Sequence, residues 1–472
     1  MPTSNATRRL KIVAKVLVAI AFFALMNALL TFVLEPYGSR SQLAWQDYEK
    51  QKSLDTILVG TSCVEYGIDP AVINKACGIK SYNLASPSQS IEESFVGIRT
   101  AYEDHHITRA ILGLSFNSLT SSTPPNPGSA YMHNRSLYAT PLETFAVTNE
   151  FLWHYGAATS AYSLNFPFPW ASNPIRSLRI PTLAENVKAK LEHADVAAMA
   201  ERLESGWHYV GLGHGARKGT MDLNGSNVRQ VNKAEDEEEV AGAAAIEDTA
   251  TLDPDRERTI REICAYCDER GIDLLVIMPP LPSHDVFDRD STYFETISYI
   301  EDLFADMGKP VYDFNLAEDD LYDLKPDYFA DNWHCNLKGA QVYSRSFAKF
   351  LKAYMAGENV ADLFMTPEQK YAELDYIAAV FAESSVQPDG VHLKWHAVAS
   401  PERPVEYRVM LKLDNDADAA DPANWKAVSD WSNATEIAYL PERQGVVKLR
   451  ICARFVGSDA EYDRYRTVTE FW

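Results

Sequence analysis

Beyond residue 50, short apolar runs alternate with stretches in which apolar residues recur at helical spacing. The apolar runs are nearly continuous, as in parallel strands buried on both faces, and four are expected to be strands: Leu54–Val59, Arg109–Leu114, Ile272–Met278 and Pro310–Asp313. Helical spacing is found in four other segments: Ile91–Asp104, Arg256–Arg270, Tyr293–Met307 and Leu337–Tyr354. This alternation predicts an α/β fold, with a parallel sheet, helices on both faces and right-handed crossovers.

The N-terminus departs from this pattern. Basic residues at 8, 9, 11 and 15 precede an apolar run from Val16 to Leu34 that only two polar residues interrupt. As a helix, a run of this length just crosses a hydrocarbon core about 30 Å thick, so residues 1–36 are expected to form a cytoplasmic tip and a membrane anchor. The basic flank before the run and Glu35 after it place the N-terminus in the cytoplasm and the rest of the chain outside.

A cleaved signal peptide is the competing interpretation of the same run. The residues that follow it, Glu35-Pro36-Tyr37-Gly38, offer no convincing small-x-small cleavage site, which favours an uncleaved anchor. Both interpretations export everything after about residue 40.

Residues 118–255 do not follow the α/β rhythm and are expected to form an insertion over the edge of the core. This segment opens with a Pro/Asn/Ser-rich stretch and closes with an acidic low-complexity run, 232–255, which predicts a solvated, mobile linker. Between them lies a glycine-rich stretch, Gly211–Gly219. No strand is predicted to lead into it and no Gly-Lys-Ser/Thr follows, so a loop is expected rather than a phosphate-binding site.

From about residue 385 the apolar positions change to period two. About six short strands are expected: Val391–Trp395, Tyr407–Leu413, Trp425–Trp431, Glu436–Leu440, Val447–Ile451 and Tyr465–Trp472. Residues 385–472 are therefore predicted to form a β-sandwich similar to a fibronectin type III or immunoglobulin-like module. The pattern leaves open whether this module is a spacer or binds a ligand.

Length, net charge and cysteine spacing limit the number of domains and the classes of ligand that the chain can bind. The 472 residues suggest two or three domains, and the net charge of −22 argues against nucleic-acid binding because phosphate backbones would be repelled. Cys264 and Cys267 form a CxxC within a predicted helix, where buried small side chains are expected rather than a redox pair. No second pair at ligand spacing supports a metal site.

Two short motifs carry candidate chemistry. Ser62 follows the first predicted strand through Gly60-Thr61, which places it at the carboxyl edge of the sheet, where open α/β folds bind ligands. Asp331 and His334 form an Asp-x-x-His motif just before the last predicted helix. One loop could thus deliver both a base for Ser62 and the carboxylate that orients this base. Each motif alone has a simpler explanation, a turn for the first and a helix cap beside a buried histidine for the second.

Together the motifs resemble the SGNH/GDSL hydrolase superfamily over about residues 50–355. Three segments, Gly60–Pro70, Tyr82–Ser90 and Asp331–Ser344, are similar to its surface-anchored branch, which includes D-alanyl transfer proteins of teichoic acids and alginate O-acetylation proteins. The resemblance implies an SGNH-like (flavodoxin-like) sheet and a cell-surface enzyme acting on a carbohydrate or cell-wall polymer of a bacterial envelope. A membrane-bound O-acyltransferase is the implied partner.

The oxyanion-hole blocks of that superfamily match less well. The second of these blocks matches the Tyr82–Ser90 segment. There Ala85 and Ser88 stand at the glycine positions, and Ser88 is the candidate backbone donor. A positive φ there would be strained in a residue other than glycine. In the third block, Asn117 is kept and could donate its side-chain amide, while the flanking Gly and Asp are absent.

The expected function is ester hydrolysis or O-acyl transfer through an acyl-serine, with Ser62, His334 and Asp331 as the triad and no metal or organic cofactor. The alternative is a catalytically inactive SGNH-like envelope protein that binds or scaffolds beside an O-acyltransferase, which the degraded middle motifs permit. Cys63 and Cys335 each follow a triad member directly, and both a disulfide and two buried thiols fit this placement.

Overall fold

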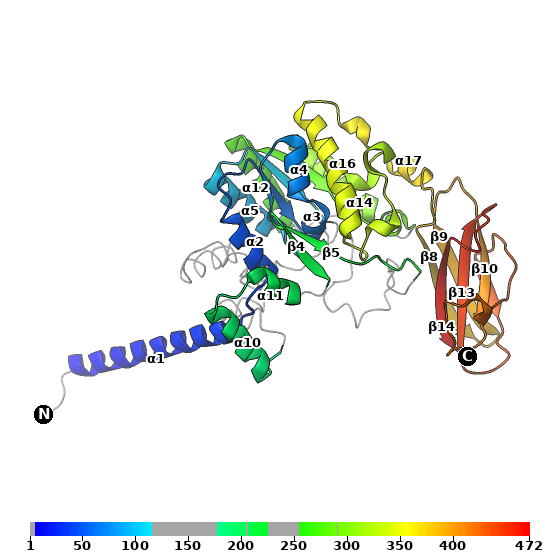
Figure 1. Ribbon diagram of the computed structural model, residues 1–472, viewed down its shortest axis with the longest axis horizontal. Coiled ribbons are helices and arrows are strands. Elements are labelled where there is room, and N and C mark those ends of the chain that lie inside the picture. The colour runs from blue at the N-terminus through cyan, green and yellow to red at the C-terminus, as the bar shows by residue number, and fades with distance from the viewer. Residues whose placement is uncertain (1–4, 116–176, 204–205, 225–253, 290) are drawn as a thin grey trace.

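A computed structural model describes residues 5–115, 177–203, 206–224, 254–289 and 291–472 (Figure 1). Asn117, most of the predicted insertion and nearly all of the acidic linker lie outside the described residues.

The centre of the fold is a five-stranded parallel sheet of order β2-β1-β3-β6-β7. Its strands are β1 (Thr56–Gly60), β2 (Ser81–Asn83), β3 (Arg109–Gly113), β6 (Asp273–Met278) and β7 (Val311–Asp313). The four predicted strands are therefore confirmed, and the short edge strand β2 was not predicted. Gly60 and Gly113 are partners in the register of β1 and β3, so these two strands end together.

Alternate side chains of the strands feed two hydrophobic clusters, one on each face of the sheet. Ile57 and Val59 join a cluster with α5 (Ile91–His105), α12 (Pro254–Arg270) and α14 (Tyr293–Ala305). Leu58 joins the opposite cluster, which includes α3 (Ser62–Gly67), α4 (Pro70–Cys77) and α16 (Leu337–Met355). The mixed α/β fold with helices on both faces is thus confirmed, and each predicted helix is present at nearly its predicted bounds.

Side-chain caps explain why these helices begin where they do. Ser90 and Glu93 form a capping box at the start of α5, with Glu93 N–H donating to Ser90 Oγ (3.1 Å). Asn336 caps α16 by accepting a hydrogen bond from Gly339 N–H (2.9 Å), which fixes the end of the Asp331–His334 loop.

The C-terminal part contains two antiparallel sheets, of order β11-β10-β13-β14 and β12-β9-β8. Side chains of both sheets, among them Leu393, Val409 and Ile451, form one hydrophobic cluster. The strands are β8 (Ala379–Gln387), β9 (Gly390–Val398), β10 (Val405–Lys412), β11 (Trp425–Ala427), β12 (Glu436–Tyr439), β13 (Val446–Phe455) and β14 (Arg464–Phe471).

The first of these strands, β8, begins before the predicted start of the module at residue 385. Its opening residues do not alternate, because Val380 packs into the cluster between the two C-terminal sheets whereas Phe381 packs into the cluster of the parallel sheet. Both faces are therefore buried, which hides the period-two signal at this junction.

The N-terminal helix α1 (Asn5–Leu34) projects from the rest of the chain (Figure 1). Within it, Arg8–Leu34 is long and apolar enough to cross a membrane. Its end is held by α10 (Ile180–Leu191), whose Asn186 side chain donates to the carbonyl oxygens of Val33 (3.0 Å) and Glu35 (2.9 Å). The other described α-helices are α2 (Arg40–Tyr48), α11 (Val196–Leu203), α13 (Ser283–Phe287), α15 (Asp319–Tyr322) and α17 (Pro367–Ala372).

Candidate active site

Ser62 is the first residue of α3, immediately beyond the end of β1. Thr61 caps this helix by accepting a hydrogen bond from Cys63 N–H (3.4 Å). Gly60 has a φ of +143°, and a Cβ there would meet the Gly113 carbonyl oxygen and lie 2.9 Å from Val64 Cγ2. Only glycine fits where β1 and β3 lie this close together. The turn at Gly60 leads directly into α3 and so determines where Ser62 lies.

Two hydrogen bonds connect Ser62 to His334 and His334 to Asp331. Ser62 Oγ lies 2.8 Å from His334 Nε2, although the two residues are 272 positions apart in the sequence. His334 Nδ1 lies 2.8 Å from Asp331 Oδ1 and 3.0 Å from its Oδ2. The structure therefore brings together the three residues that the sequence proposed as a triad.

The loop that carries Asp331 and His334 is fixed by its own backbone. Asp331 Oδ1 also accepts hydrogen bonds from the N–H groups of Trp333 (2.9 Å) and His334 (3.0 Å), and Ala330 N–H donates to the His334 carbonyl (2.8 Å). Desolvation raises the pKa of Asp331, but the hydrogen bond to His334, its charge, the Trp333 N–H and Arg217 outweigh it, so this pKa lies below its ordinary value. Asp331 is accordingly held as a carboxylate.

A β-hairpin, formed by β4 (Trp207–Gly211) and β5 (His214–Arg217), adds a residue that the sequence did not indicate. Arg217 Nη1 contacts Asp331 Oδ2 and lies 2.9 Å from His334 Nδ1. The Arg217 guanidinium lies over the ring of Tyr66, 5.5 Å from its centre, and this ring packs edge-to-face on His334 at 4.9 Å.

The loop predicted for Gly211–Gly219 is therefore wrong in part, since the stretch contains strand β5. Its glycines are needed because the backbone packs closely: a Cβ on Gly213 would meet the Asn83 carbonyl, and one on Gly215 would meet the Trp207 indole. Glycine-rich composition hides strand propensity, and a contact across 114 residues leaves no spacing signal for Arg217.

Of the two oxyanion-hole candidates, only Ser88 lies within the described residues. Ser88 is exposed in the turn between β2 and α5, and its φ of +54° is in the left-handed region that favours glycine. In the same turn, Ser86 N–H donates to the Gly60 carbonyl (3.1 Å), which places the turn beside the end of β1. Ser88 thus adopts the positive φ that is strained in a residue other than glycine.

All six cysteines are free thiols, so Cys63 and Cys335 form no disulfide. Cys63 Sγ donates to the Trp333 carbonyl (3.4 Å), which ties α3 to the Asp331–His334 loop. Burial raises the pKa of Cys63 to about 11, and it also raises the pKa of Cys335. Cys264 and Cys267 are buried inside α12, as expected for small core side chains.

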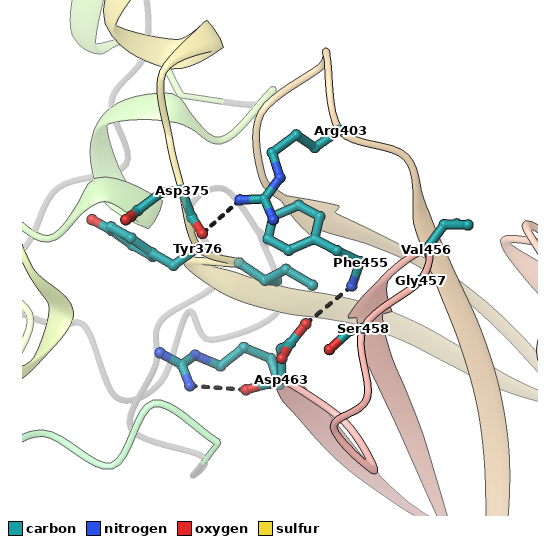
Figure 2. A pocket seen from close by; sticks show the side chains of 10 residues that line it. Asp375, Tyr376, Arg403, Phe455, Val456, Gly457, Ser458 and Asp463 are labelled. Carbon is teal, nitrogen blue, oxygen red and sulfur yellow. Dashed lines mark hydrogen bonds between the residues drawn. The ribbon is translucent and has the colours of Figure 1, made fainter.

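Other features of the described chain lie apart from this triad. Among the described residues, no group of three or more His, Cys, Asp or Glu side chains is placed to hold a metal ion. A pocket of about 430 Å³ lies where the segment before β8 meets the turn between β13 and β14 (Figure 2). Arg403 and Phe455 help to line it, with Arg403 donating to the Asp375 carbonyl (2.7 Å), and no triad residue borders it.

No sequence model of a protein family matches this chain, and no curated protein matches it in sequence. The geometry of the site therefore carries the functional argument.

Proposed function

We propose that this chain is a serine-dependent acyl-ester hydrolase or O-acyltransferase with Ser62 as nucleophile, His334 as general base and Asp331 as the residue that orients the base. The observation that supports this most is the pair of 2.8 Å contacts from Ser62 Oγ to His334 Nε2 and from His334 Nδ1 to Asp331 Oδ1. A hydroxyl, an imidazole and a carboxylate in this order are the parts that activate a serine for attack on an ester.

In the proposed reaction, Ser62 Oγ attacks the acyl carbonyl while its proton passes to His334 Nε2. The tetrahedral intermediate collapses, the ester C–O bond breaks, and His334 returns the proton to the leaving alcohol. Water or a sugar hydroxyl then attacks the acyl carbon of the acyl-serine, and the bond between that carbon and Ser62 Oγ breaks. The proton of the attacking group passes through His334 to Ser62 Oγ. The Ser62 N–H belongs to the first turn of α3, where N–H groups have no partner within the helix, and is the proposed oxyanion donor with Ser88 and Asn117.

The proposed fold is SGNH-like, with a C-terminal module similar to fibronectin type III or immunoglobulin domains. Support comes from the parallel sheet, in which the nucleophile follows β1 and the Asp-x-x-His loop precedes the last long helix, α16. By the same resemblance, the substrate is a carbohydrate or cell-wall polymer, and a membrane-bound O-acyltransferase supplies the acyl group. The helix Arg8–Leu34 supports a single-pass anchor, with the N-terminus in the cytoplasm and the site outside.

The test is turnover of p-nitrophenyl acetate by the detergent-solubilised full chain. Ser62→Ala and His334→Ala should each lower kcat by at least about a thousandfold, and Asp331→Asn should do so by a comparable factor. Ser385→Ala, at an exposed position of β8, is the matched control and should leave turnover unchanged. Undiminished turnover in Ser62→Ala would end this mechanism. A folded wild-type chain that takes no fluorophosphonate label at Ser62 would favour the inactive binding or scaffold protein instead.

A further inference from the structure

Arg217 lies where the proposed base meets its carboxylate, and the mechanism above gives it no role. Its Nη1 contacts Asp331 Oδ2, the oxygen that is not held by the backbone of the loop. The side chains of Arg217 and Asp331 are 33% and 37% exposed, so water reaches this ion pair and weakens the attraction between the two charges.

Arg217 Nη1 lies 2.9 Å from His334 Nδ1, and both nitrogens approach the carboxylate of Asp331. A guanidinium donates hydrogen bonds and cannot accept them. The two nitrogens can share a hydrogen bond only when Nδ1 carries no proton, and the ring proton then sits on Nε2, facing Ser62. In this tautomer His334 cannot take the Ser62 proton. The productive tautomer has Nδ1–H donating to Asp331, so Arg217 and His334 compete for the same carboxylate.

The hairpin holds Arg217 in this place. Trp207 Nε1 donates to the Glu65 side chain (3.2 Å), and His214 Nδ1 lies 2.7 Å from the Glu65 carbonyl oxygen. Both contacts tie the hairpin to α3, the helix that begins with Ser62 (Figure 1). Arg217 is thus fixed relative to the nucleophile, unlike a long side chain on an open surface.

The charged and titratable groups around His334 come from four elements. Its own loop supplies Asp331, and the hairpin supplies Arg217. On α3 lie the Cys63 thiol, kept protonated by burial, and the Tyr66 ring. Behind Tyr66, Arg40 of α2 contacts its hydroxyl and pairs with Glu65 at 3.6 Å, so that charge is balanced within the pair. Of the cations in the described part of the chain, Arg217 is the one that contacts Asp331 and His334 directly.

We propose that Arg217 is a positioning residue of the triad. It holds Asp331 Oδ2 in place and disfavours protonation of His334, because both side chains share the same carboxylate. A second positive charge on the imidazole is disfavoured beside the guanidinium. Removing the guanidinium should therefore favour the protonated imidazole, because Asp331 alone would then face it. This role rests on the proposed function, in which neutral His334 is the active form.

The first test is the pH profile of kcat/KM with p-nitrophenyl acetate. Arg217→Gln removes the cation, so its acid limb should move to higher pH, and the ratio of rates at about pH 5 and about pH 8 should fall by about fivefold. Arg217→Lys keeps the charge and should recover most of that ratio. Lys218→Gln removes the same charge from the adjacent exposed residue and should leave the ratio within about twofold of wild type. An acid limb that is unchanged in Arg217→Gln would overturn the proposal.

The second test does not depend on turnover. In the full chain labelled with ¹³C-histidine, the His334 signal is assigned by its loss in His334→Gln and followed against pH. Its titration midpoint should rise in Arg217→Gln and stay in place in Lys218→Gln. Equal midpoints in wild type and Arg217→Gln would overturn the inference. A raised midpoint in a chain that takes no fluorophosphonate would sink the proposed enzyme and leave the role of Arg217 toward His334 standing.

Discussion

Replacing Gly213 by alanine should displace the hairpin that carries Arg217. Gly213 lies in the turn between β4 and β5 with a φ of +82°, next to Leu212, whose carbonyl accepts a hydrogen bond from Asn83 N–H (3.0 Å). A Cβ on Gly213 would lie 2.8 Å from the Asn83 carbonyl carbon and 2.9 Å from Tyr82 Cε1, and closer still to the Asn83 oxygen. Asn83 and Tyr82 are fully buried in β2, so neither can move aside.

Two costs add at this position. Alanine in a left-handed conformation costs about 1–2 kcal/mol, and forcing an extra methyl group into a packed contact costs about 1–3 kcal/mol more. Gly206, just before β4, separates these costs. It has the same φ of +82°, but among the described residues no atom beyond its chain neighbours would lie within 4 Å of its Cβ. Gly206→Ala should therefore pay only the backbone cost, and Gly213→Ala should be less stable by about 1–3 kcal/mol.

The assay is urea unfolding of both variants in the full chain, followed by tryptophan fluorescence, together with the pH profile of ester turnover. Gly213→Ala should unfold at lower urea and acquire the acid sensitivity expected of Arg217→Gln, because the displaced hairpin carries Arg217 away from Asp331. Gly206→Ala should show neither a comparable loss of stability nor the acid sensitivity. If the two variants unfold and titrate alike, the hairpin does not pack against β2 as described, and the reasoning fails.

Two further predictions concern buried polar groups behind the site. Burial lowers the pKa of His284 from 6.5 to about 4. The stability that comes from burying the neutral imidazole is therefore present above pH 6.5 and is lost as the pH falls towards 4. His284→Gln should reduce this loss, measured as the difference between the urea unfolding midpoints at pH 6.5 and pH 4. An equally steep loss in the variant would contradict this assignment. Asn83→Ala removes donors to the buried carbonyls of Val64 (3.0 Å) and Ile68 (3.1 Å) and should destabilise the chain by about 2–3 kcal/mol in urea unfolding, whereas no change would show that water replaces the amide.

The buried strands and the two motifs could be predicted because their signals are local. β3 and β6 are nearly continuous apolar runs, and α16 combines helical spacing with the Asn336 cap. The rule that open α/β sheets bind ligands at the carboxyl ends of their strands placed Ser62, whereas the approach of His334 to it was expected only from the combination of the two motifs. The edge strand β2 escaped prediction because it has only three residues, and its Asn83 is buried through bonds to α3 and its C-cap.

The contacts of the hairpin could not be predicted, because the relevant information is spread over distant segments. Arg217 stands in a glycine-rich stretch whose composition is typical of a loop, and its partner Asp331 is 114 residues away. His214, fully buried in the same stretch, bonds to the Glu65 carbonyl at a separation of 149 residues. Such tertiary contacts override local propensity and leave no periodic trace in a single sequence.

The segment without an α/β rhythm contacts both the long apolar helix α1 and the triad. Its helix α10 holds the end of α1 through Asn186, and its hairpin places Arg217 on Asp331. From the N-terminal side, Arg40 follows the end of α1 closely and contacts Tyr66, whose ring packs on His334. Two separate segments that adjoin the end of α1 thus also contact the His334 ring or the Tyr66 ring packed on it. An insertion that only decorated the edge of the sheet would need neither contact, so this segment is a structural part of the site.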